Sequence, residues 1–153
     1  MSKVHIKTAI GLLNIVWPEF GEVNGAIFRK GGTRVVGTED MDTTGREAFA
    51  NHQHILDLFQ HKAYKTGDTE DFYIPSHPDF IAACEFGKKL ATIWFSKLRQ
   101  DFPHHRFRVY YTQDDNPIVR FHRVRDDEPF WLSEADHRQA ITDGKVMVLD
   151  SGR

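Results

Sequence analysis

The sequence predicts an α+β domain with a mainly antiparallel sheet, built from two hairpins and a C-terminal strand, with helices packed on one face. Two observations lead to this fold class. Segments of alternating character with central turn residues occur twice, and two helical segments lie next to each other between them. Hairpins that flank grouped helices are typical of α+β domains, whereas a parallel doubly wound sheet needs strands that alternate with helices.

The composition predicts one globular domain over residues 1–153. The chain is 40% apolar with a formal net charge of -2, so any attraction for anions has to be local. Cys84 is the only cysteine, which excludes a disulfide framework and favours a reducing compartment, the cytoplasm. The apolar stretch Ala9–Trp17 is well short of the roughly 18–20 residues of a membrane span, so we expect neither an anchor nor a signal peptide.

A first helix is expected over Lys3–Val16. Its apolar residues recur at helical spacing and Pro18 follows the pattern. These residues are Ile6, Ile10, Leu13 and Trp17. A strand is the alternative, because residues 15–17 are β-branched or aromatic and favour extended chain.

The first hairpin is expected in the segment GAIFRKGGTRVV. Gly31 and Gly32 can supply the positive φ angles of a two-residue turn between two short strands.

A second helix is expected to begin at Thr44, which stands with Glu47 at capping-box spacing. Its apolar face would carry Phe49, Leu56, Phe59 and Ala63. The same helical spacing puts His52 within that apolar face.

The longest helix is expected to start between Ser76 and Asp79, with Pro78 in its first turn, and to run to about Asp101. Its apolar stripe is wide, which predicts a central helix buried between two layers. Cys84 lies on that stripe and is expected to pack in the core.

The second hairpin is expected within His104–Arg125, in the sequence HHRFRVYYTQDDNPIVRFHRVR. A short helix should follow, capped by Ser133 and ending at Gly144, and residues 145–150 should form the last strand.

The alternation of side chains in this hairpin predicts a basic outer face on the sheet. Phe107, Val109 and Tyr111 share one parity and should face the helices. The opposite parity carries Arg106, Arg108, Tyr110, Arg120 and His122, and the first hairpin adds Arg29 and Arg34. Guanidinium groups bind phosphate or carboxylate in bidentate fashion. These seven residues are therefore the predicted ligand-binding set.

The function predicted from this face is that of a small cytoplasmic binding or regulatory protein with an anionic partner: a nucleic acid, a nucleotide or an acidic protein surface. The alternative is that the arginines only keep a half-exposed sheet polar, or pair with nearby aspartates such as Asp114 and Asp126. No known nucleic-acid-binding module matches the sequence.

His54, Asp57 and His61 share one polar face of the expected second helix. The two histidines would lie about 10 Å apart along its axis, too far to chelate one ion. We therefore predict no metal site and no cofactor.

A second function class is a small-molecule enzyme or sensor with a pocket between helix and sheet. His52 is the weak catalytic candidate, with an inward aromatic such as Tyr111 contacting the ligand. Whether the protein is an enzyme stays open at this stage. Trp17, Phe130 and Trp131 would seal the core or form an interface, which makes a homodimer compatible with the sequence.

Overall fold

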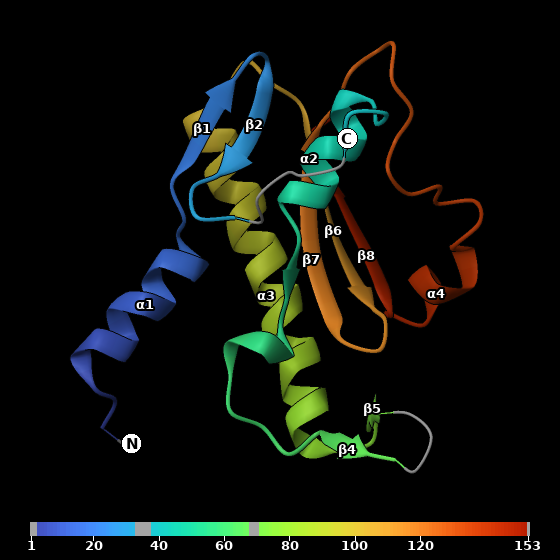
Figure 1. Cartoon of the computed structure of the whole chain (residues 1–153). Coiled ribbons are helices and arrows are strands. Elements are labelled where there is room, and N and C mark those ends of the chain that lie inside the picture. Colours follow the sequence, from blue (N-terminus) through green and yellow to red (C-terminus); the bar gives the residue numbers. More distant parts are fainter. Residues whose placement is uncertain (1–2, 33–37, 68–70, 153) are drawn as a thin grey trace.

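The computed structural model describes residues 3–32, 38–67 and 71–152 (Figure 1). Its helices are α1 (Ile6–Val16), α2 (Thr43–Ala50), α3 (Pro78–Asp101) and α4 (Arg138–Thr142), with a 3-10 turn η1 (Leu56–Leu58). Its strands are β1 (Phe20–Val23), β2 (Ala26–Arg29), β3 (Gln53–His54), β4 (Tyr64–Thr66), β5 (Asp71–Tyr73), β6 (Phe107–Gln113), β7 (Pro117–Arg123) and β8 (Val146–Asp150).

The main sheet has four antiparallel strands in the order β3-β7-β6-β8, and α3 packs against one of its faces (Figure 1). This confirms the α+β class and the antiparallel sheet. The second hairpin, β6–β7, and the C-terminal strand β8 are also confirmed. In its register Arg108 lies opposite His122 and Tyr110 lies opposite Arg120, so the predicted outer residues do share one face.

The core lies between α3 and the sheet. Trp94 of α3 is fully buried and its indole meets Phe121 edge to face, with ring centroids 6.1 Å apart. Phe107, Val109 and Tyr111 are buried in the same cluster, as their parity predicts. Gly87 allows the close approach, because a Cβ there would stand 2.9 Å from the Tyr111 ring.

The other face of the sheet is covered, so the prediction of an open cationic face is wrong. The connection between β7 and β8 returns across this face, with α4 beside β8 (Figure 1). Leu132 packs there with Tyr110 and Val146 in a second apolar cluster. Arg108, Tyr110 and His122 are consequently buried.

The first hairpin differs from the prediction in two ways. Its turn is Asn24–Gly25, both with positive φ (50° and 76°), rather than Gly31–Gly32. It also forms a separate two-stranded sheet and does not join the main one. The strand expected after Gly32, and with it Arg34, falls on residues 33–37, outside the described residues.

The helix α1 confirms the first helical segment and excludes the strand alternative. The second helix is much shorter than predicted. Its N-cap is Asp42, whose carboxylate accepts the Gly45 N–H, and not Thr44. The helix ends at Ala50, so the placement of His52 on its apolar face is wrong. His54 in β3 and Asp57 in η1 likewise share no helix.

The long helix is confirmed with its start between Ser76 and Asp79: the side chain of His77 is the N-cap and Pro78 opens the first turn. The helix predicted from Ser133 to Gly144 is limited to α4, and the chain before α3 forms the antiparallel strands β4 and β5. Within the described ranges, none of the helices combines the length and apolar character needed to cross a bilayer.

Candidate anion site at Arg120

Two of the predicted arginines are already paired with an acid from β8. Asp150 accepts hydrogen bonds from Arg106 Nη2 at 3.0 Å and from Arg108 Nε at 2.8 Å. Burial opposes ionisation of Asp150, but hydrogen bonds from the Gly152 N–H and from both arginines hold its pKa below the usual value. Arg108 also pairs with Glu134 at 3.0 Å and lies 3.5 Å over the Phe130 ring. In both arginines the adjacent Nε and Nη2 donors are therefore already engaged by carboxylates.

Tyr110 and His122 are hydrogen-bonded to each other beneath the connection between β7 and β8 (residues 124–145), called the covering segment below. The Tyr110 hydroxyl lies 2.8 Å from His122 Nε2, and His122 Nδ1 lies 2.8 Å from the Arg123 carbonyl. Because a carbonyl can only accept, Nδ1 carries the proton and Nε2 accepts from the phenol. Burial lowers the pKa of His122 and raises that of Tyr110 to about 12, so both are neutral at neutral pH.

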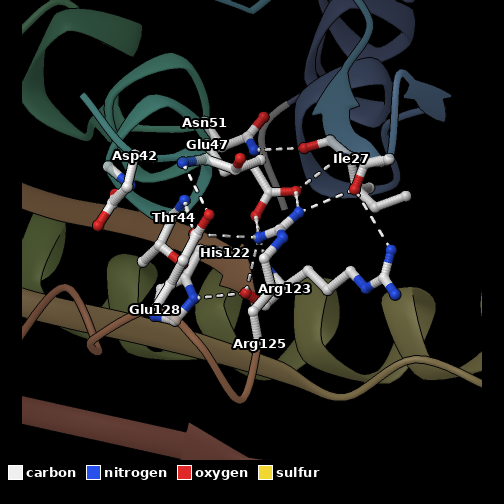
Figure 2. A network of polar contacts seen from close by, with 12 residues as sticks. Ile27, Asp42, Thr44, Glu47, Asn51, His122, Arg123, Arg125 and Glu128 are labelled. Carbon is white, nitrogen blue, oxygen red and sulfur yellow. Dashed lines mark hydrogen bonds and ion pairs between the residues drawn. The ribbon is translucent and has the colours of Figure 1, made fainter. Parts of the chain in front are cut away.

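A closed polar network holds Arg123, the last residue of β7, and Arg125, two residues further on (Figure 2). Glu47 of α2 is fully buried, and its carboxylate accepts hydrogen bonds from both Nη groups of Arg125, at 2.9 and 3.0 Å. The same carboxylate accepts the backbone N–H groups of Ile27 and Arg123, at 2.6 and 2.8 Å. Burial disfavours the charge on Arg125, yet the hydrogen bond and charge of Glu47 raise its pKa. This network joins the first hairpin, α2 and β7.

Glu128 completes the network from the covering segment. Its two oxygens accept the N–H groups of Thr43 and Thr44, at 3.1 and 2.6 Å, at the start of α2 (Figure 2). Although burial acts the other way, these bonds lower the pKa of Glu128. Glu128 therefore has a structural role that the sequence analysis did not foresee.

Arg29 lies on the opposite side of the sheet from the other candidates. Its guanidinium lies over the Trp94 ring at 5.2 Å and Nη2 donates to Gln53 Oε1 at 3.0 Å. Gln53 pairs with Val119, whose side chain belongs to the core face. Arg29 therefore cannot contribute to a site on the covered face.

Arg120 is the member of the predicted set that keeps binding capacity on the outer face. No residue within the described ranges accepts a hydrogen bond from its buried Nε, and no carboxylate there lies within ion-pair distance of it. Its guanidinium contacts the Trp131 ring, 5.2 Å from the centroid. Burial lowers its pKa, but an arginine stays protonated at neutral pH. The charge of Asp114 partly offsets this burial, but Asp114 lies beyond ion-pair distance, and a largely buried cation without a direct counter-ion is costly.

One histidine lies within electrostatic range of this cation, and a second lies against the first. His54 lies in β3, next to β7 in the sheet, and its ring centroid is 5.1 Å from that of His52. Burial lowers the pKa of His54, and the charges of His52 and Arg120 lower it further. Asp57 and Asp114 act in the opposite direction on His54. An anion bound here would satisfy Arg120 and favour protonation of His54.

Trp131 supplies a partly open aromatic surface to the same corner. The residue is 40% exposed although Arg120 lies against its ring. A planar ligand group can stack on an exposed indole. We call Arg120, His54, His52 and Trp131 the Arg120 corner.

The sequence predicted Arg120 as a ligand-binding residue and pointed to other roles for His52, His54 and Trp131. It could not group them, because His54 reaches Arg120 only through the β3–β7 pairing and Trp131 only through the fold-back of the covering segment. The alternation of side chains along β7 correctly predicted the face on which Arg120 lies. It carries no information about the segment that covers this face.

A second basic groove lies at the C-terminal end of α3. It has a volume of about 690 Å³ and is lined by Arg99, His104, His105 and Arg106, among others. Arg106 is already engaged by Asp150, and His105 lies 3.8 Å from Glu22. Two of its four basic side chains therefore already have acidic neighbours, unlike the guanidinium of Arg120.

A pocket of about 310 Å³ with a mostly apolar lining lies between η1 and α3. Its walls include Leu56, Phe59, His61, Ala83 and Phe86, and not His52. The buried Nδ1 of His61 has no hydrogen-bond partner among the described residues. The pocket thus combines an apolar wall with one unsatisfied polar atom.

Comparison of the chain with protein-family models, with curated proteins and with solved structures gives no match, so the argument for function rests on the geometry described above.

Proposed function

We propose that the protein is a binding or regulatory module whose Arg120 corner takes one small ligand with a phosphate or carboxylate group and a planar ring. The observation that carries this proposal is the unpaired guanidinium of Arg120, with its buried Nε lacking an acceptor among the described residues. The other arginines of the hairpin are bound by carboxylates. Among the arginines of this hairpin, Arg120 is therefore the one whose guanidinium has no carboxylate partner among the described residues.

The size of the corner favours a small ligand over a long polyanion. Nucleic acids and acidic protein surfaces are usually bound by several cations spread over a face. Here Arg108 is buried beneath Phe130, so one guanidinium remains with its neighbouring histidines. A single anionic group matches that charge, and a ring on Trp131 would add stacking.

The experiment is isothermal titration of the protein with adenosine 5′-monophosphate, inorganic phosphate and adenosine at low ionic strength. We expect the nucleotide to bind most tightly, phosphate more weakly and adenosine least, with affinity falling as salt is added. Arg120→Met should weaken nucleotide binding about tenfold or more, because it removes the bidentate, charged hydrogen bonds.

Two matched variants control for the loss of a positive charge and for the location of the binding site. Arg138→Met removes an exposed arginine of α4 and should leave binding unchanged. Arg99→Met removes the arginine of the second basic groove. If Arg99→Met abolishes binding while Arg120→Met does not, the site is that groove and the proposal is wrong. Absence of binding by all three probes would also reject it.

The pocket beside His61 supports a second candidate, the binding of a small apolar ligand with one polar atom. Ala83 is buried at its wall, so Ala83→Leu should fill the pocket. Thermal-shift screening with indole and p-cresol should show stabilisation of the wild type that Ala83→Leu removes. Equal stabilisation of both proteins would exclude this pocket.

A further inference from the structure

The helix α1 carries its large apolar side chains on the outside. Ile6, Ile10 and Leu13 are 68%, 52% and 61% exposed, and Trp17 just after the helix is 49% exposed. None of the residues of α1 is buried. In Figure 1, α1 stands out beside α3 at the edge of the molecule. An exposed apolar stripe of this kind marks an interaction surface.

The attachment of α1 to the body uses its other side and its C-terminal end. Ile15 and Val16 pack against the core, and the Ile15 carbonyl accepts the Trp94 indole N–H at 2.9 Å. The helix has only 11 residues, too short to be stable in water through propensity alone. Contact along its outer stripe would therefore stabilise it.

The spacing of the stripe identifies the kind of partner. Ile6, Ile10, Leu13 and Trp17 are separated by four, three and four residues, which is the a/d pattern of a coiled-coil seam. Such a seam fits another helix. The same stripe on a second copy of the chain is self-complementary about a two-fold axis.

The charges favour an antiparallel pair. Lys3 and Lys7 lie at the N-terminal end of α1, and the described residues before Glu19 include no acid. A parallel pair would bring these lysines together. An antiparallel pair sets them beside the C-terminal end of the other helix, where the helix dipole is negative and where Glu19, which pairs with Lys30 of its own chain, keeps a 74% exposed side chain.

We propose that the chain forms a homodimer through an antiparallel pairing of α1 with α1 of a second copy. Ile10 would then face Leu13 of the second copy, and Ile6 would face Trp17 of the second copy. The area that this short seam can bury is smaller than the roughly 800 Å² per partner of a standard interface, so the dimer is expected to be reversible.

The test is sedimentation equilibrium of the whole protein over a concentration series. The mass of the wild type should rise from 17.7 kDa toward twice that value. Ile10→Glu should raise the dissociation constant about tenfold or more, because it places a carboxylate in the seam. Val23→Glu is the control, since Val23 is 57% exposed in β1, and it should behave as the wild type.

Orientation is tested by disulfide cross-linking in a Cys84→Ser background. A mixture of Ile10→Cys and Leu13→Cys chains should give the mixed disulfide faster than either chain gives its own. Faster self-linking of Ile10→Cys would indicate a parallel pair and overturn the proposed arrangement. Circular dichroism of each variant verifies that the fold is retained.

A wild type that stays monomeric at every concentration overturns the dimer. Cosedimentation of such a monomer with vesicles of phosphatidylcholine and phosphatidylglycerol, lost in Ile10→Glu, would assign the stripe to a lipid surface instead. Equal loss of the dimer in Val23→Glu would also reject α1 as its interface.

Discussion

Arg120 and Arg125 come from the same hairpin segment and differ in their electrostatic partners. Arg125 is held by both oxygens of the buried Glu47, whereas Arg120 has an aromatic ring against it and His54 nearby. A buried, fully bonded ion pair fixes structure, and a cation that lacks its counter-ion is available for a ligand. The comparison separates arginines that build this fold from the one proposed to bind.

The largest effect is expected from Glu47→Ala. This change leaves Arg125 without its carboxylate and two backbone N–H groups without acceptors, so the free energy of unfolding should fall by about 3–5 kcal/mol. Urea denaturation measures it. Glu85→Ala, at an exposed position of α3, should change stability by less than about 0.5 kcal/mol. Similar losses in both variants would show that the network has no special role.

A smaller effect is expected from pH. The pKa of both His122 and His54 is lowered on folding, so the unfolded chain binds more protons just below the usual value of 6.5. Their contribution to stability is complete above pH 6.5 and declines as pH falls through the lowered pKa values. Urea titrations between pH 7 and about 5 should show this decline, because Glu128 and Asp150 take up protons only at lower pH.

The two histidines can be told apart with ligand present. His122→Gln should remove the part of the pH dependence of the unfolding free energy that arises from His122. Adenosine 5′-monophosphate should offset the loss that arises from His54, since bound anion favours its protonation, and affinity should rise as pH falls. A nucleotide affinity that decreases as the pH is lowered would contradict a role for His54.

The smallest effect on stability is expected from Arg120→Met. Methionine keeps a packing contact for Trp131 and removes a buried Nε without an acceptor, so the free energy of unfolding should change by less than about 0.5 kcal/mol or increase slightly. Thermal unfolding of this variant beside Arg125→Met gives the contrast directly. A loss as large as that of Arg125→Met would mean that Arg120 is structural.

The sequence predicted the parts of the fold that depend on local pattern. The alternation of Phe107, Val109 and Tyr111 against Arg106, Arg108 and Tyr110 was sufficient to assign the two faces of β6. The long apolar stripe of α3 was sufficient to place that helix over the core.

The parts that failed depend on contacts distant in sequence. Thr44 and Glu47 satisfy the capping-box spacing, yet Asp42 caps the helix, because Glu47 is drawn into the network with Arg125. The Arg108–Asp150 pair joins residues 42 positions apart and requires the β6–β8 register. The covering segment has no strong periodicity, so its fold-back over β6 and β7 could not be foreseen, and the exposed face was overestimated.

The most direct measurement of the central claim follows the arginine Nε–H resonances by ¹H–¹⁵N NMR during titration with inorganic phosphate. We predict a saturable shift of the Arg120 signal, while the signals of Arg108 and Arg125 stay in place because their guanidiniums are already bound. An unchanged Arg120 signal, or equal shifts of all three, would contradict the account.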